Sequence, residues 1–267
     1  MYSVTYHRAS SVADAVKLLK KADDGKLVSG GMTLIPAMKT RLAAPSDLVD
    51  LRHVKELKGV KVSGKNVTIG AATTHAEVAA NEKLAKVCPA ICHLAAHIGD
   101  PHVRHMGTIG GSVANNDPAA DYPAALLALG ATIVTDKREI PADKFFKGLF
   151  ETSLKDNEVI TAVTFTAPAK CGYSKFPNPA SRYAMTGVFV AKGKDGVRAA
   201  VTGAGDDGVF RSKEIEAALS KKFEAGALEG ASVPSKNLMS DIHASADYRA
   251  NLVVVMAKRA VAAATAG

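Results

Sequence analysis

The sequence predicts an α+β protein made of two small lobes followed by a C-terminal α+β unit. Strand and helix patterns alternate near the N-terminus, short strands and helices mix through the middle, and the C-terminal third reads as strands followed by helices. A chain of 267 residues, 47% of them hydrophobic, can bury one large core or two to three smaller ones. We expect domains at 1–55, 56–168 and 169–267, with the second boundary near Pro168–Gly172.

The N-terminal lobe reads as a β-α-β-α-β unit. Ser11 can cap a first helix, and Thr33 can cap a second one that has Pro36 in its first turn. Gly30 and Gly31 connect the middle strand to that second helix. The strands of this unit are predicted at 2–7, 26–29 and 47–51.

The second lobe begins with a hairpin at 60–70 and continues with helices. Thr74 and Glu77 form a capping box, and Pro89 opens a helix that runs to about Ile98. The segment 105–121 is rich in Gly, Asn and Asp and poor in helix formers, so we expect irregular structure there. The remaining elements are a helix at 121–129, strands at 131–135 and 159–166, and a short helix near Phe145.

The C-terminal unit begins with strands near 172–176, 186–192 and 197–205. Lys194-Asp195-Gly196 joins the last two as a tight turn. Helices at 212–219 and about 248–264 close the chain, and the second has Leu252 and Met256 at helical spacing.

Composition and charge exclude several classes of function. The net charge is +8, but aromatic residues make up only 5% and Trp is absent, so we expect no nucleic-acid partner. The N-terminal stretch lacks the apolar core of a signal peptide, and no stretch is apolar for long enough to span a bilayer. Three cysteines fit a reducing compartment, so we expect a cytoplasmic protein.

Two glycine-rich turns are the candidate binding elements. The turn "SGGMT" (29–33) matches neither the Walker nor the Rossmann pattern, and taken alone it is equally consistent with a tight strand-to-helix connection. The turn "GTIGGS" (107–112) adds three glycines and two hydroxyl groups. Neither turn contains Lys or Arg, so backbone N–H groups would have to hold an anionic ligand. Two such turns from different lobes suit a large dinucleotide.

Three segments resemble the FAD-binding medium subunit of molybdenum hydroxylases, the group that contains carbon monoxide dehydrogenase and xanthine dehydrogenase. They are "SGGMTLIPAMKTRLAAPSDLVDL", "GDPHVRHMGTIGGSVANNDPAADYPAALLALGA", and "GYSKF" followed by "RYAMTGVFVA". The resemblance implies a two-lobed FAD-binding domain of the vanillyl-alcohol-oxidase/PCMH type and a C-terminal domain of the carbon monoxide dehydrogenase flavoprotein type.

The resemblance also implies a set of FAD contacts. The first turn would wrap the pyrophosphate, the second would cover the pyrophosphate and ribityl side, and three further residues would lie by the ring systems. These residues are Ser29, Gly30, Gly31, Met32 and Thr33; Thr108, Ile109, Gly110, Gly111 and Ser112, with Asn115 and Asp121 nearby; and Ile160, Lys175 and Tyr183. No side chain is expected to act as a catalytic acid, base or nucleophile.

Departures from related patterns refine this expectation. Met32 stands where related flavin oxidases often have a His that bonds covalently to flavin, so the FAD should be non-covalent. The stretch "SKFPNPASRY" has prolines and an Asn where relatives often have basic residues. Three cysteines are too few for the four-cysteine iron–sulfur cluster of some relatives. "CPAICHLAAH" allows a zinc hypothesis, but we interpret it as a packed helix and expect no metal ligands in this chain.

The resemblance therefore implies an electron-transfer subunit. A large molybdenum-cofactor subunit would oxidise the substrate, a small iron–sulfur subunit would pass electrons to FAD, and FAD would reduce an external acceptor such as a quinone, NAD or oxygen. The assembly would be a dimer of heterotrimers. Two alternatives remain open at this point: a stand-alone FAD-dependent oxidoreductase, and a flavin-free scaffold subunit. The substrate is not encoded in this chain.

Overall fold

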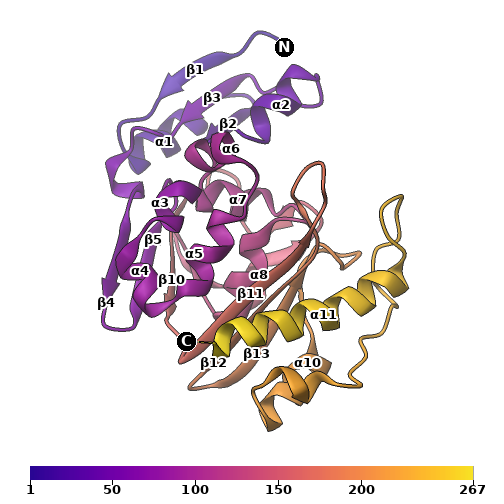
Figure 1. The fold of residues 1–267 in the computed structure, drawn as a ribbon. Coiled ribbons are helices and arrows are strands. Elements are labelled where there is room, and N and C mark those ends of the chain that lie inside the picture. Colours follow the sequence, from indigo (N-terminus) through magenta and orange to yellow (C-terminus); the bar gives the residue numbers. More distant parts are fainter. Residues whose placement is uncertain (267) are drawn as a thin grey trace.

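The computed structural model describes residues 1–266 and contains three main sheets that follow one another along the chain (Figure 1). The first sheet is parallel, with strand order β1-β3-β2. Ser11 caps α1 by accepting a hydrogen bond from the Asp14 N–H, as predicted. Thr33 stands at the N-cap of α2, but its side chain makes no capping hydrogen bond. The elements are β1 Thr5–Arg8, α1 Val12–Leu19, β2 Gly25–Val28, α2 Leu34–Lys39 and β3 Asp47–Asp50.

The second lobe is a five-stranded sheet, in order β4-β5-β10-β6-β7, whose neighbouring strands are all antiparallel. The hairpin at 60–70 and the Thr74–Glu77 capping box are confirmed. The elements are η1 Lys55–Leu57, β4 Val60–Ser63, β5 Asn66–Gly70, α3 His75–Ala79, α4 Glu82–Val87, α5 Pro89–Ala96, α6 Pro101–Met106, α7 Ile109–Asn115, α8 Asp121–Ala128, β6 Thr132–Thr135, β7 Glu139–Pro141, α9 Ala142–Phe145, β8 Phe146–Gly148, β9 Glu151–Thr152 and β10 Ile160–Thr166.

The prediction of irregular structure at 105–121 is wrong, because α7 occupies the middle of that segment. Thr108 caps α7 by accepting a hydrogen bond from the Gly111 N–H. The Gly110 N–H donates to the Ala71 carbonyl at 2.8 Å, and Ile109 and Val113 are fully buried. Tertiary packing therefore supports a helix that the glycine-rich sequence would not favour alone.

The C-terminal unit is a four-stranded sheet, in order β11-β12-β13-β14, covered by helices on both faces. Successive residues of β12 point to opposite sides: Val188 packs with α11, whereas Phe189 packs with the core of the second lobe. This alternation joins the unit to the second lobe through shared packing. The elements are β11 Lys170–Pro177, β12 Ala184–Gly193, β13 Gly196–Thr202, β14 Phe210–Arg211, α10 Lys213–Lys221, η2 Ala225–Leu228 and α11 Ala246–Thr265.

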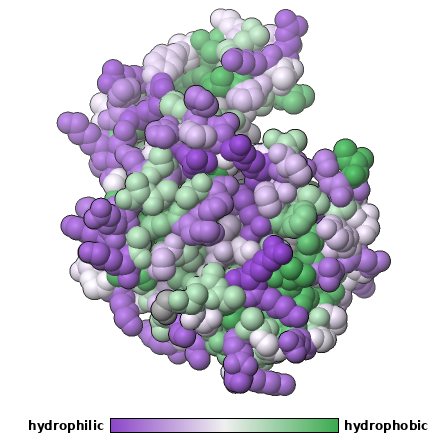
Figure 2. All heavy atoms as spheres, in the orientation of Figure 1, coloured by the Kyte–Doolittle hydropathy of each residue, from purple (hydrophilic) through white to green (hydrophobic). Residues whose placement is uncertain are grey.

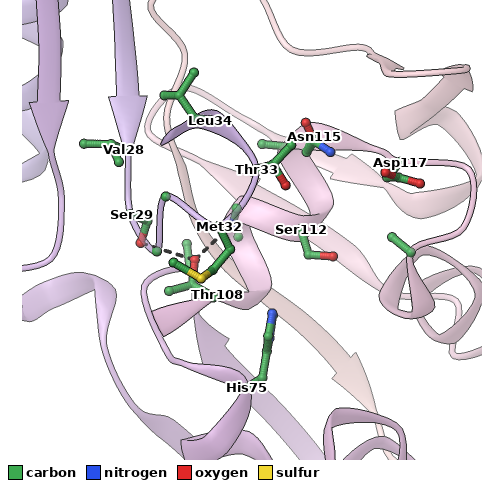
Figure 3. Close-up of a pocket in the computed structure, with 18 of the residues that line it drawn as sticks. Val28, Ser29, Met32, Thr33, Leu34, His75, Thr108, Ser112, Asn115 and Asp117 are labelled. Atoms are coloured by element: carbon green, nitrogen blue, oxygen red, sulfur yellow. Dashed lines mark hydrogen bonds between the residues drawn. The ribbon is translucent and has the colours of Figure 1, made fainter. Parts of the chain in front are cut away.

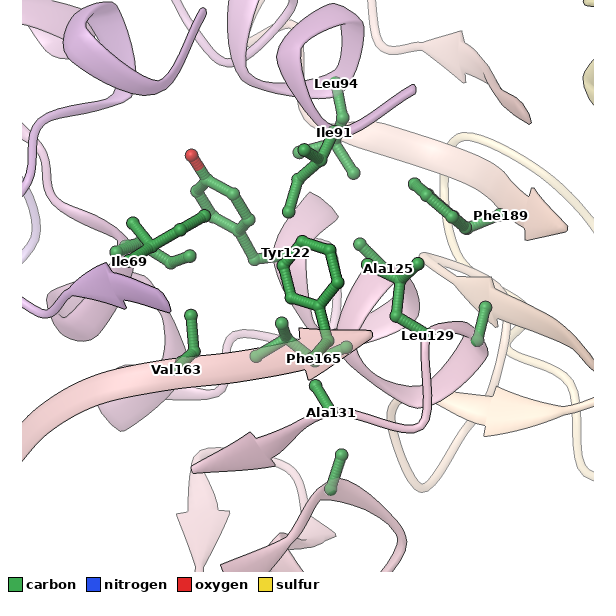
Figure 4. Packing of buried hydrophobic residues seen from close by; sticks show 14 of the residues in the cluster. Ile69, Ile91, Leu94, Tyr122, Ala125, Leu129, Ala131, Val163, Phe165 and Phe189 are labelled. Atoms are coloured by element: carbon green, nitrogen blue, oxygen red, sulfur yellow. The ribbon is translucent and has the colours of Figure 1, made fainter. Parts of the chain in front are cut away.

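The largest core lies where α5 and α8 pack between the second sheet and the C-terminal sheet (Figure 4). Tyr122 stands in this core with its ring between Ile69 and Phe165, and all three are buried. Cys88 and Cys92 belong to the same core, as the interpretation of a packed helix predicts. The face shown in Figure 2 is mostly hydrophilic, and an indentation separates the N-terminal lobe from the rest of the molecule. No helix within residues 1–266 has both the length and the apolar character to cross a bilayer.

Candidate functional site

A cavity of 560 Å³ lies between the N-terminal lobe and the second lobe, and both glycine turns line it (Figure 3). The two turns touch directly, because the Thr108 hydroxyl donates to the Ser29 hydroxyl at 3.2 Å. A Cβ on Gly30 would overlap the Met106 carbonyl oxygen and would lie 2.6 Å from the Gly107 Cα. Gly30 is therefore needed for the close contact between the turns themselves.

The first turn presents free hydrogen-bond donors. Strand β2 ends at Val28, Gly31 adopts a positive φ of 71°, and α2 begins at Leu34. Residues 30–34 all line the cavity. Within the part of the chain that the structure describes, no group accepts a hydrogen bond from their N–H groups. Backbone N–H groups without protein partners are suited to an anionic ligand.

The second turn differs from the sequence expectation, because its N–H groups are already used. The Ile109 N–H donates to the Thr73 carbonyl at 3.1 Å, and the Gly110 N–H donates to Ala71. The Gly111 and Ser112 N–H groups donate to the Thr108 hydroxyl and carbonyl. These bonds hold the turn against the segment after β5, so it offers hydroxyl groups and an open glycine face to the cavity. A Cβ on Gly111 would meet only the Thr108 hydroxyl oxygen, at 3.1 Å.

Most of the predicted contact residues line this one cavity. Ile109 does not line it and is fully buried beneath the second turn. Lys175 lines a neighbouring cavity instead. The lining residues from the predicted set are Ser29, Gly30, Gly31, Met32, Thr33, Thr108, Gly110, Gly111, Ser112, Asn115, Asp121, Ile160 and Tyr183.

Lys175 is a buried cation paired with Asp121. Its side chain is 6% exposed, and its Nζ lies 3.0 Å from a carboxylate oxygen of Asp121. The hydroxyl of Tyr173 also donates to this carboxylate. Burial raises the pKa of Asp121, and the charge of Lys175 opposes that rise. Because Asp121 lines the first cavity and Lys175 the second, the pair forms part of the wall between them.

His75 and Glu158 also line the cavity, and the sequence analysis missed both as lining residues. Burial lowers the pKa of His75 to about 4, and the charge of Arg104 adds to this effect. The His75 Nδ1 is buried without a hydrogen-bond partner, so a proton added there would be unsatisfied. The sequence did contain one signal for His75, which directly follows the capping residue Thr74. In the structure this turn packs against the second glycine turn, because the His75 N–H donates to the Gly107 carbonyl.

The hydrogen bond from Arg138 lowers the pKa of Glu158 to about 2. Arg138 contacts both carboxylate oxygens, at 2.8 and 2.9 Å. Lys26, a cation of the lining, is paired with Asp24 at 3.2 Å. The cavity therefore offers backbone N–H donors rather than a cluster of lysines and arginines.

Residues 2–168 match the family described as the FAD binding domain in molybdopterin dehydrogenase. The chain belongs to this FAD-binding family of molybdopterin dehydrogenases. It is an FAD-binding oxidoreductase subunit of the molybdenum hydroxylase class. The carbon monoxide dehydrogenase medium chain of Hydrogenophaga pseudoflava is 33% identical, with 98% of this chain and 96% of that protein covered.

Two further relatives extend over nearly the whole FAD-binding chain. The nicotine 6-hydroxylase medium subunit of Paenarthrobacter nicotinovorans is 34% identical, over 99% of this chain and 98% of that protein. The solved structure of reconstituted CO dehydrogenase from Oligotropha carboxidovorans has a chain that superimposes with a TM-score of 0.89 at 33% identity, covering 99% of this chain and 98% of that one. The predicted fold class is thereby confirmed.

The cavity fits the cofactor that this family binds. Five free N–H donors in the first turn can meet a diphosphate, and the open face of Gly111 leaves room for a ligand to approach the second turn. The volume of 560 Å³ lies within the range of roughly 300–1,000 Å³ that small-molecule sites occupy.

Proposed function

We propose that this chain binds FAD non-covalently in the cavity between the two glycine turns and transfers electrons within a molybdenum hydroxylase complex. The observation that carries the proposal is that residues 30–34 have N–H groups without protein partners and line a cavity bounded on its other side by the second turn. The family match at residues 2–168 supports FAD as the ligand.

The two turns would contribute differently to binding. The N–H groups of residues 30–34 would donate to the diphosphate, because they have no competing partners. The hydroxyl group of Ser112 would add a neutral donor from the opposite side, whereas the Thr108 hydroxyl already donates to Ser29. Met32 offers a thioether, which forms no covalent bond to flavin. When bound, FAD supplies the redox chemistry, and the chain holds and orients it.

Tyr183 and Ile160 would contact the ring systems of the cofactor. Tyr183 is 45% exposed at the rim of the cavity, whereas Ile160 is buried in its wall. Asn115 and Asp121 lie near the second turn. Lys175 would act on the flavin only through Asp121, since it does not line the cavity. Ile109 would support the second turn from beneath.

The proposed complex contains a large molybdenum-cofactor subunit and a small iron–sulfur subunit, arranged as a dimer of heterotrimers. Electrons would enter FAD from the iron–sulfur clusters and leave to an external acceptor. The names of the two relatives, "medium chain" and "medium subunit", support a multi-subunit assembly. We also propose that domain boundaries follow residues 55 and 168 and that the protein is cytoplasmic.

The visible absorption spectrum of the purified chain tests FAD binding. Native protein should show flavin bands after reconstitution, with one FAD per chain, and acid denaturation should release all of the flavin into solution. The absence of flavin bands after reconstitution would contradict the proposal. Purification from the native cell tests the assembly: a large molybdenum chain and a small iron–sulfur chain should accompany this one, whereas a flavin-loaded chain isolated alone would favour the stand-alone oxidoreductase.

A further inference from the structure

A second cavity, adjacent to the proposed FAD cavity, is lined by cationic and polar side chains. It also measures 560 Å³ and lies between the end of α5, the start of α6 and the loop from β11 to β12. Figure 1 shows α5 beside β11, and the two elements are in contact. The ionisable side chains in its lining are His93, His97, Arg104, Tyr173, Lys175 and Arg182, and no carboxylate is among the lining residues.

The nearby carboxylates already have partners. Asp121 lies behind Lys175 and accepts hydrogen bonds from Lys175 and Tyr173. Asp100 caps α6 by accepting from the Val103 N–H at 2.9 Å. Asp121 balances the charge of Lys175, and Asp100 acts on Arg182, so the three cations of the lining, Arg104, Lys175 and Arg182, outnumber the two carboxylates behind it.

Arg104 and Lys175 are held in place by protein contacts. One terminal nitrogen of Arg104 donates to the Ile98 and Gly99 carbonyls at 3.1 and 3.0 Å, which fixes the guanidinium at the cavity wall. Its other N–H groups remain available, because a guanidinium carries five donors. Lys175 is fixed by its buried ion pair with Asp121. A preorganised set of cations loses little freedom when an anion binds.

The loop that carries Arg182 is ordered by its own hydrogen bonds. The Asn178 side chain accepts from the Ala180 and Ser181 N–H groups, and the Arg182 N–H donates to the Asn178 carbonyl at 2.8 Å. Arg182 itself adopts a φ of 62°, a conformation that is costly for a residue other than glycine. Such backbone strain concentrates at ligand-binding positions.

We propose that this second cavity binds a small multivalent anion of the phosphate-bearing class. Guanidinium groups match phosphate oxygens with paired hydrogen bonds, and the ammonium group of Lys175 adds a further donor. Gly99 and Arg182 line both cavities, so the bound anion lies next to the ligand of the first cavity. Binding of the anion does not depend on the identity of that ligand.

Calorimetric titration of the full chain with inorganic pyrophosphate tests this site. The protein is titrated both with and without saturating FAD, so that the first cavity is filled in one arm. We expect saturable binding of one pyrophosphate per chain when FAD fills the first cavity, and this binding should persist in the FAD-free arm, where the first turn can bind a second pyrophosphate. The variant Ala96→Glu should weaken binding at least tenfold, because it places a carboxylate at an exposed helical position in the lining. Arg182→Gln should weaken binding similarly.

Ala263→Glu is the matched control, because Ala263 is exposed on α11, which covers the other face of the C-terminal sheet. It should bind pyrophosphate like the unchanged protein. Failure of the unchanged protein to bind millimolar pyrophosphate overturns the proposal. Undiminished binding by both Ala96→Glu and Arg182→Gln overturns it as well. Binding that disappears when FAD is added, and that Ala96→Glu leaves unchanged, would place the anion in the first cavity and also overturn it.

Discussion

His75 keeps a neutral imidazole against the second turn. His75 is 4% exposed, and its buried Nδ1 has no hydrogen-bond partner that would stabilise a second proton on the ring. Burial, followed by the charge of Arg104, lowers its pKa to about 4, whereas an unfolded chain would protonate this histidine near its ordinary pKa of 6.5. Protonation of His75 therefore destabilises the folded state as the pH falls from 6.5 to about 4.

The stability of the protein should depend on pH through His75. Because the unfolded state binds the proton first, His75 should lower the free energy of unfolding by about 2 kcal/mol between pH 7 and pH 5. His75→Gln should remove this contribution, so its stability should fall less steeply over that interval. Urea denaturation at several pH values measures the difference. Parallel curves for the two proteins would show that His75 does not titrate in this way.

Glu158 shows the opposite linkage. The hydrogen bond from Arg138 lowers its pKa to about 2 from an ordinary value of 4.5. Its stabilising effect should be complete above the ordinary value and should disappear as the pH falls toward 2. Glu158→Gln should therefore lower the free energy of unfolding at pH 7 by about 3 kcal/mol, with little difference from the unchanged protein near pH 2. Glu229→Gln, at an exposed position, is the control and should change stability by less than about 0.5 kcal/mol.

Among the elements, the two glycine turns have separate requirements. Gly30 lies against the backbone of the second turn, whereas Gly111 faces the cavity. Substitutions at Gly30 and Gly111 should therefore affect stability and FAD binding differently, although both glycines belong to similar Gly-Gly pairs.

Gly30→Ala should destabilise the protein as well as weaken FAD binding. Its Cβ would collide with the backbone at Met106 and Gly107, which is not free to rotate away. Overpacking of this kind costs roughly 1–3 kcal/mol. Thermal unfolding of the flavin-free chain should show a lower melting temperature than that of the unchanged chain. An unchanged melting temperature would mean that the two turns are not packed together in the flavin-free protein.

Gly111→Val should weaken FAD binding at least a hundredfold without a comparable loss of stability. The side chain would enter the cavity, where the protein itself offers almost no obstruction. Gly193→Val is a matched control, because its Cβ would meet no atom within 4 Å and its turn is remote from the cavity. Fluorescence titration with FAD measures both variants. Equal affinity in Gly111→Val and Gly193→Val would remove Gly111 from the binding site.

Several elements could be predicted from local patterns. Ser11, the Thr74–Glu77 box and Pro89 each act through neighbouring backbone, so their helices follow directly from the sequence. Helix α7 could not be predicted in this way. Its glycines are poor helix formers, and the contacts of Gly110 with Ala71 that support it cross about forty positions of the chain.

At the scale of the whole molecule, the sequence predicted two glycine turns for one ligand, and the structure brings those turns together. The sequence could not predict that the first turn has free N–H groups whereas those of the second turn are already hydrogen-bonded. The N–H groups of Ile109 and Gly110 are used by a neighbouring segment, which no local pattern reveals. The burial of Lys175 against Asp121 likewise depends on the packing of the C-terminal sheet on α8.

Amide hydrogen exchange of the whole chain, with and without FAD, measures whether one ligand protects both glycine turns. The N–H groups of residues 30–34 have no protein partners, so they should exchange quickly in the flavin-free chain and slow markedly when FAD binds. Residues 108–115 should gain protection at the same FAD concentration, because the proposed ligand would contact both turns. Protection that is confined to one turn, or that develops in the two turns at different FAD concentrations, would contradict the account.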